Sequence, residues 1–211
     1  MAYVVKTLVN GNLEQNCYLL YDDARREAVV VDPGSDPQAL RQAISAAGVK
    51  PVLILATHGH FDHVGAVQAL KDAYGVPFGL SKADAELLEV LEDSFAYYGM
   101  GSTTKPGVDR WLLAGEVLQV GGMDLRVLGT PGHTLGGLCF YHPASGSLFI
   151  GDTLFSGSVG RSDFEGGSHP QLIDSIRREL WVLPPATKVY PGHGPASDIA
   201  EEKAHNRFLQ A

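Results

Sequence analysis

Three histidines and one aspartate stand within residues 57–63, directly after the apolar run 51–56. In an extended segment, residues two apart point the same way, so His58 and His60 can face one ion. Asp62 and His63 turn the corner that follows. Imidazole and carboxylate groups are metal ligands, and their arrangement here predicts two metal positions rather than one.

Three further candidate ligands follow apolar, strand-like runs elsewhere in the chain: His133, Asp152 and His193. Each alone has an ordinary explanation, as a loop histidine or a turn aspartate. Together, however, five of the eight histidines and two aspartates stand at glycine-flanked strand ends, and this favours a shared metal site. The remaining histidines lack this pattern and are given no catalytic role: His142, His169 and His205.

Alternating strand-like and helix-like segments must position these side chains. Strands are predicted at 3–9, 17–21, 28–31, 52–56, 117–120, 125–128, 138–141, 148–150 and 188–190. Helices are predicted at 36–47, 65–71, 84–91, 170–180 and near 200–208. Segment 95–107 mixes aromatics with glycine and is either a covering loop or ordinary surface packing. If the strand ends are parallel, the candidate ligands meet at one sheet edge.

Composition indicates one globular domain spanning residues 1–211, with 45% hydrophobic and 19% charged residues. A formal net charge of −8 without blocks of like charge argues against nucleic acid and anionic membranes as partners. The first residues lack the pattern of an export signal, and no apolar run approaches a membrane span, so we expect a cytoplasmic protein. Cys17 and Cys139 lie in apolar runs and are expected as reduced core residues, with a disulfide the minor alternative.

The motif His-x-His-x-Asp-His at 58–63, followed by His133, Asp152 and His193, resembles the metallo-β-lactamase superfamily over nearly the whole chain. This resemblance implies an α+β fold, a four-layer αβ/βα sandwich in a single domain. It also implies which residues share each metal ion. One ion is held by His58, His60 and His133, the second by Asp62, His63 and His193, and Asp152 bridges them.

Within that superfamily, the segments 151–155, 160–164 and 191–194, followed by Glu201 and Asn206, resemble the glyoxalase II group, the hydroxyacylglutathione hydrolases. The short bacterial form is the most similar. True β-lactamases of the superfamily usually place a cysteine where this chain has Asp152, so the resemblance argues against antibiotic hydrolysis.

The function implied is metal-dependent hydrolysis of a small-molecule thioester of the S-D-lactoylglutathione type to a hydroxy acid and a free thiol. Two divalent ions, zinc with iron or manganese as alternatives, would hold the attacking hydroxide between them. Asp62, as ligand and proton acceptor, would orient the hydroxide. Arg161 is the candidate partner for an anionic substrate group, and its alternative is a structural pair with Asp163 or Glu165.

Other functions use the same scaffold. A persulfide dioxygenase would bind a single iron and consume oxygen, so metal count separates it from the hydrolase. Lactonases are a third choice, and a nuclease fits the acidic composition poorly. A non-catalytic metal-binding scaffold predicts missing ligands, whereas all seven positions are filled here. The oligomeric state does not follow from the sequence.

Overall fold

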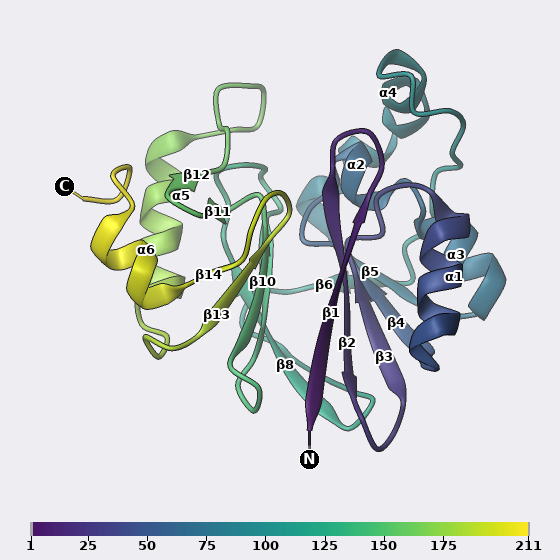
Figure 1. Cartoon of the computed structure of the whole chain (residues 1–211). Helices are drawn as coiled ribbons and strands as arrows, with labels where there is room; N and C mark the ends of the chain where they lie inside the picture. Colours follow the sequence, from purple (N-terminus) through teal and green to yellow (C-terminus); the bar gives the residue numbers. More distant parts are fainter. Residues whose placement is uncertain (1, 211) are drawn as a thin grey trace.

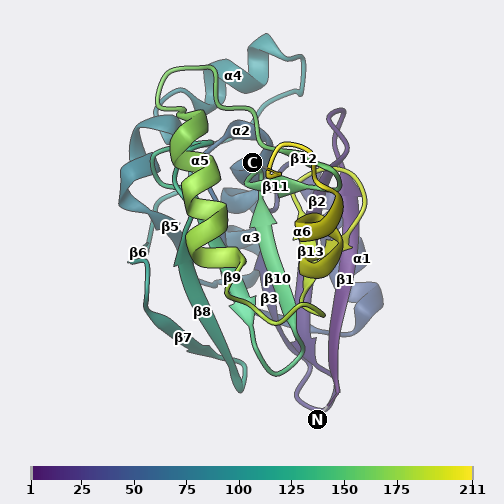
Figure 2. The same ribbon diagram turned by 90° about the vertical axis from the view of Figure 1, so that its left-hand side faces the viewer.

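The computed structural model, described here over residues 2–210, contains two six-stranded sheets packed face to face with helices on both outer sides. In Figure 1, α1 and α3 lie outside one sheet and α5 and α6 outside the other. Figure 2 shows α5 and α6 in front of the second sheet. The predicted α+β four-layer sandwich in one domain is therefore confirmed.

The first sheet is built from the N-terminal half of the chain. Its strands, in spatial order, are β1 (Tyr3–Asn10), β2 (Gln15–Asp22), β3 (Glu27–Val31), β4 (Lys50–Leu55), β5 (Phe78–Ser81) and β6 (Arg110–Leu112). The first three strands pair antiparallel, and the pairs from β3 to β6 are parallel. The histidine motif begins after β4, whose end lies at the upper end of the first sheet in Figure 1.

Helical segments connect the strands of this half of the chain. They are α1 (Pro37–Ala47), α2 (Phe61–Val64), α3 (Val67–Tyr74), the 3-10 helix η1 (Lys82–Leu88) and α4 (Leu91–Tyr97). As predicted, Asp36 caps α1, accepting a hydrogen bond from Ala39 N at 3.1 Å, and Gly48 ends it with a φ of 64°.

The second sheet comes from the C-terminal half. Its spatial order is β14 (Ser197–Asp198), β13 (Lys188–Pro191), β10 (Ser147–Gly151), β9 (Leu138–His142), β8 (Met123–Gly129) and β7 (Val117–Val120). Only β10 and β13 pair in parallel among these strands. The hairpin β11 (Leu154–Phe155) and β12 (Ser158–Val159) follows β10, and α5 (His169–Ser175), the π-helical turn η2 (Ile176–Leu180) and α6 (Ile199–His205) complete this half.

The central strands are buried on both faces, which explains why they are largely apolar, whereas β7 and β8 alternate between buried and exposed residues. In β2, Tyr18 and Leu20 pack between the sheets, whereas Cys17 and Leu19 pack under the helices. Cys17 and Cys139 are free, fully buried thiols, as expected. Within residues 2–210, no helix is both long and apolar enough to cross a bilayer.

Several predicted elements differ from the structure. The helix expected at 65–71 is α3, which begins only at Val67, because Ala66 N donates to Pro33 O; the separate short helix α2 precedes it at Phe61–Val64 and was not predicted. The helix expected at 84–91 is the 3-10 helix η1, and α4 begins only at Leu91. The last helix ends at His205, since the next residue, Asn206, is extended and donates from its side chain to Ser158 O. The short strands β5, β6, β11, β12 and β14 were not predicted.

The expectation of a single sheet edge was wrong. The end of β4 belongs to the first sheet, whereas β8, β10 and β13 belong to the second. The candidate ligands therefore meet between two sheets, which enclose the site from both sides.

Candidate metal centre

All seven candidate ligands lie together at one end of the interface between the sheets. His58 and His60 are on the loop after β4, and Asp62 and His63 are on α2. His133 follows β8, Asp152 follows β10, and His193 follows β13. Because these loops are anchored by buried strands, the side chains are positioned by the core of the fold.

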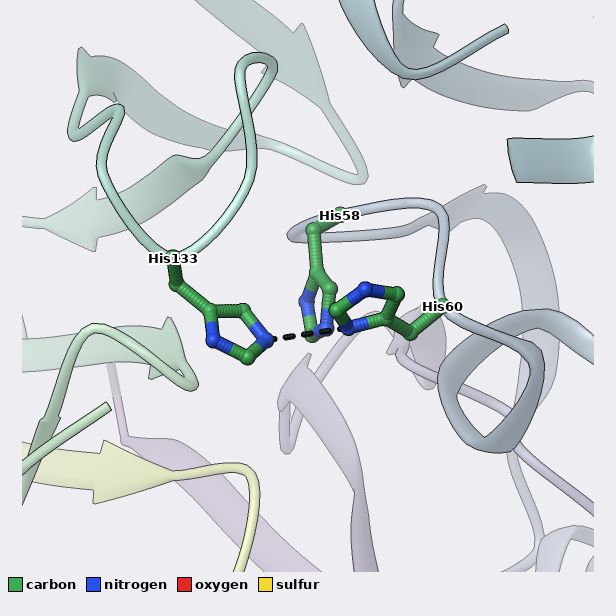
Figure 3. A group of neighbouring side chains, drawn as sticks. All are labelled: His58, His60 and His133. Carbon is green, nitrogen blue, oxygen red and sulfur yellow. Dashed lines mark hydrogen bonds between the residues drawn. The ribbon is translucent and has the colours of Figure 1, made fainter. Parts of the chain in front are cut away.

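The first ligand group contains His58, His60 and His133, whose ligand atoms lie within 4.8 Å of one another. Figure 3 shows the three imidazoles turned toward a common point, from two different loops. His60 Nδ1 is 2.9 Å from His133 Nε2. The opposite nitrogen of His133, Nδ1, donates to Arg161 O at 2.6 Å, because a carbonyl oxygen can only accept. A lone pair of neutral His133 therefore remains at Nε2, inside the group.

The second group contains Asp62, His63 and His193, again within 4.8 Å of one another. Asp62 Oδ2 lies 3.2 Å from His193 Nε2 and 3.8 Å from His63 Nε2. His193 Nδ1 donates to the carbonyl of Leu13 at 3.0 Å, so its Nε2 faces the group. The turn between β1 and β2 thus orients a histidine 180 residues away in the sequence.

Asp152 lies between the two groups. Its Oδ1 is 3.4 Å from His63 Nε2, and its Oδ2 is 3.6 Å from His133 Nε2. Gly192 makes room for this carboxylate, because a Cβ at position 192 would meet Asp152 Oδ1 at 2.2 Å and His63 Cε1 at 2.5 Å. A residue larger than glycine would displace one of these two side chains.

Burial and neighbouring charges set the protonation of the first group. Burial, reinforced by nearby imidazoles, lowers the pKa of His58 and lowers the pKa of His60 to about 4. Burial also lowers the pKa of His133, although Asp152 opposes it. These three imidazoles are neutral at pH 7, which is the form that binds a metal ion.

The second group and Asp152 combine acids with bases. Burial alone would lower the pKa of His63, but the carboxylates of Asp152 and Asp62 outweigh it and raise that pKa. Burial is likewise outweighed at His193, whose pKa is raised by Asp62 and Asp152. Burial opposes ionisation of the two aspartates, yet His63 holds the pKa of each below its usual value. Both carboxylates are therefore ionised at neutral pH.

The donor set fits a divalent cation. Within residues 2–210, four buried side-chain polar atoms have no hydrogen-bond partner, and three of them are His58 Nε2, His63 Nε2 and Asp152 Oδ1. Buried polar atoms are rarely left unpaired, and the ligand atoms of these three residues lie within 4.8 Å of one another. Imidazole nitrogens and carboxylate oxygens without thiolate suit zinc, iron or manganese.

Asp32 is a functional residue that sequence reasoning missed, since Asp32 was interpreted only as part of a turn. Its carboxylate accepts hydrogen bonds from Thr57 N and Thr57 Oγ1, both at 2.7 Å, and from His63 Nδ1 at 3.0 Å. Because the Thr57 hydroxyl donates to Asp32, its oxygen accepts from His58 Nδ1 at 3.1 Å. One carboxylate therefore turns the Nε2 lone pairs of His58 and His63 toward the ligand groups.

Arg161 stands outside the ligand groups, on the loop that follows β12. Its Nε donates to Asp163 at 2.6 Å, and its side chain is 71% exposed. The guanidinium lies 5.3 Å from the centre of the Phe164 ring. That ring meets the imidazoles of His60 and His133 edge to face. The pairing with Asp163, which the sequence left as an alternative, is therefore present beside the site.

Segment 95–107 packs against the outer side of α2. Phe95 is buried, and the ring of Tyr98 stacks on Phe61 at 4.7 Å. Thr103 Oγ1 donates to the carbonyl of Gly65. The segment thus supports the helix that carries Asp62 and His63.

Comparisons with known proteins identify the family of this chain. The family model described as the metallo-beta-lactamase superfamily matches residues 10–193. Hydroxyacylglutathione hydrolase GloC of Haemophilus influenzae is 37% identical over 200 residues, covering 94% of each protein. The crystal structure of BLEG-1 B3 metallo-beta-lactamase is 38% identical with a TM-score of 0.92, covering 99% of this chain and 100% of that one. TTHA1623 in a di-iron-bound form is 39% identical with a TM-score of 0.88, covering 97% and 100%. The chain therefore belongs to the metallo-beta-lactamase superfamily.

Proposed function

We propose that this superfamily hydrolase uses two metal ions to cleave a thioester of the S-D-lactoylglutathione type into a hydroxy acid and a free thiol. The observation that carries the proposal is the convergence of seven nitrogen and oxygen ligands, three of whose buried atoms have no hydrogen-bond partner. The substrate class is supported by the 37% identity to GloC, a protein named for that activity.

In this proposal, each ligand group would hold one ion, and Asp152, which lies between the groups, would be a ligand shared by both. Zinc is the metal we propose, and iron or manganese suit the same ligands. The di-iron form of TTHA1623 supports iron as the alternative. When bound, two divalent ions supply positive charge for a developing oxyanion and lower the pKa of a water molecule to roughly 7, providing a nucleophile at neutral pH.

Asp62 is the proposed catalytic residue. Its Oδ2 contacts His193 and His63, so its Oδ1 is the atom that would take the proton of the attacking water. The lowered pKa of Asp62 makes its carboxylate a weak base, but it keeps the carboxylate ionised, and only this form can hydrogen-bond to and orient the attacking water as an acceptor.

A thioester suits these residues because its leaving group needs little help. A thiolate departs without a strong acid, since thiols have a pKa of about 8.5. The protein's own thiols are not available as nucleophiles. Cys17 and Cys139 are fully buried, and burial raises the pKa of Cys139 to about 12.

Arg161 is proposed to meet an anionic end of the substrate. One aromatic ring, that of Phe164, separates its guanidinium from His60 and His133. The Nε–H of Arg161 is already hydrogen-bonded to Asp163. The two Nη atoms of its guanidinium carry further N–H groups that could bind the substrate. An ion pair between the exposed Arg161 and a substrate anion would contribute only a small binding free energy. We therefore expect Arg161→Ala to raise KM severalfold with kcat unchanged. Arg178→Ala, at another exposed arginine paired with a neighbouring carboxylate, is the matched control.

The test is release of thiol from S-D-lactoylglutathione by zinc-loaded protein, with metal-stripped protein as control. We expect turnover that is proportional to enzyme concentration and absent from the stripped sample. Absence of thioester turnover in zinc-loaded and iron-loaded protein, together with oxygen uptake on glutathione persulfide, would contradict the hydrolase proposal and favour an iron-dependent dioxygenase.

Hydrolysis of a β-lactam is the second candidate, and the similarity to BLEG-1 B3 metallo-beta-lactamase favours it. The same ligands would act on an amide carbonyl, whose amine leaving group is far more basic than a thiolate and needs a proton. Thioester turnover is therefore expected to exceed β-lactam turnover on the same preparation. The reverse ranking would favour the second candidate.

A further inference from the structure

Asp84 is a buried carboxylate beside the metal centre that belongs to none of the ligand groups. It lies on η1 and is 1% exposed. Its Oδ1 accepts a hydrogen bond from Gly136 N at 2.6 Å. Its Oδ2 accepts from Gly59 N at 2.9 Å and from Thr134 Oγ1 at 2.8 Å. From the sequence, Asp84 was predicted only as the first residue of a helix at 84–91.

The three donors, Gly59, Thr134 and Gly136, lie on the two loops that carry the ligands of the first group. Gly59 stands between His58 and His60, and Thr134 directly follows His133. These two loops leave different sheets, one after β4 and the other after β8. Figure 3 shows that the first-group histidines face each other from those two loops. Asp84 is therefore a single group bonded to both sides of the first ligand group.

Two glycines make room for this contact. A Cβ at position 59 would meet Asp84 O at 2.9 Å, and a Cβ at position 136 would meet Asp84 Cγ at 2.6 Å. Neither glycine has a positive φ. The lack of a side chain at these positions is thus explained by the approach of Asp84 rather than by backbone conformation.

We propose that Asp84 is a positioning residue that fixes the distance between the two histidine loops and so sets the affinity of the first group for its metal ion. Asp32 differs because it bonds to His63 of the second group directly and to His58 only through Thr57. The inference rests on the proposed metal ligands and is independent of which substrate the protein hydrolyses.

Asp84→Asn is the most informative substitution, because it keeps the shape and exchanges one acceptor for a donor. Each carboxylate oxygen accepts from a backbone N–H, at Gly136 or at Gly59. In either orientation the amide N–H₂ therefore faces a backbone N–H, and one of the two loops loses its bond.

Asp22→Asn is the matched control. Asp22 is also 1% exposed and accepts a backbone hydrogen bond, from Ala24 N at 2.8 Å, but it ends β2 far from the site. The measurement is zinc bound per chain and zinc affinity by competition with a chelator, without any substrate. We expect one of two ions to bind about 10–100-fold more weakly in Asp84→Asn, and both to bind normally in Asp22→Asn.

Wild-type affinity for both ions in Asp84→Asn, or equal weakening of both, would overturn the proposal. Thr134→Val and Thr134→Ser provide a second test if Asp84→Asn fails to fold. Valine removes one donor to Asp84 and is expected to weaken the same ion by a smaller factor, whereas serine keeps the hydroxyl and should restore it. Identical affinities in the two variants would also contradict the role of Asp84. Since only metal binding is measured, failure of the thioesterase assay leaves this result interpretable.

Discussion

Replacing Asp32 by asparagine tests how the second ligand group is oriented. In the native protein, Asp32 Oδ1 accepts from Thr57 N, and Oδ2 accepts from Thr57 Oγ1 and His63 Nδ1. A backbone N–H cannot change its role, whereas an imidazole can move its proton. The asparagine oxygen therefore keeps the bond to Thr57 N, and its amide nitrogen faces His63 Nδ1.

This substitution changes the protonation of Nε2, the ring nitrogen of His63 that faces the ligand group. To accept from the new amide, neutral His63 must carry its proton on Nε2, the nitrogen that binds the ion. If His63 instead keeps its proton on Nδ1, it loses the hydrogen bond that it donates to the Asp32 carboxylate in the native protein. A hydrogen bond to a charged group is worth about 1.5–3 kcal/mol. At 1.4 kcal/mol per factor of ten, the ion held by His63 should bind about 10–150-fold more weakly.

Chelator competition with zinc measures this change directly, with Asp22→Asn as control for loss of a buried carboxylate. Nitrogen NMR of labelled histidines in the metal-free variant, recorded at a pH where His63 is neutral, identifies which ring nitrogen of His63 carries the proton. Unchanged affinity, or a His63 that retains its proton on Nδ1 alone, would refute the reasoning.

Three further outcomes follow from the same geometry. Gly192→Ala should displace Asp152 or His63 and abolish binding of at least one ion. Gly107→Ala is the control, because Gly107 has no positive φ and its Cβ would meet only Lys71 Nζ, at 3.8 Å, so this variant should bind both ions when metal content is measured. Asp62→Asn should lower kcat by about 100-fold or more, because it removes the proton acceptor, and wild-type kcat with full metal content would exclude that role. The pKa values of His63 and His193 are raised above the usual value of a histidine, so in the metal-free protein each imidazole stays charged to a higher pH and must lose a proton to bind an ion. Zinc affinity of the second group should therefore increase as pH rises toward those values, with protons released in calorimetry, and a pH-independent affinity would contradict it.

The ligand residues could be predicted from the sequence because each carries a local signal. Their motifs combine glycine, an apolar run and a metal-binding side chain within a few residues. The resemblance to a known superfamily then provided the sandwich fold. Those signals are short-range, which is why they survive in a single sequence.

The residues that hold the ligands in place carry no such signal. Asp32 bonds to His63, 31 residues away, and Asp84 bonds to Thr134 and Gly136, 50 and 52 residues away. The local sequence predicts only a turn at Asp32 and a helix at Asp84. Their function depends on tertiary contacts, as does the meeting of the ligands between two sheets instead of at one edge.

The most direct test of the central claim is thioester turnover measured as zinc is added in steps to metal-free protein. The account predicts that hydrolysis of S-D-lactoylglutathione rises to a plateau at two equivalents, because both ligand groups and Asp152 act together. A plateau at one equivalent, or no turnover once two ions are bound, would contradict it.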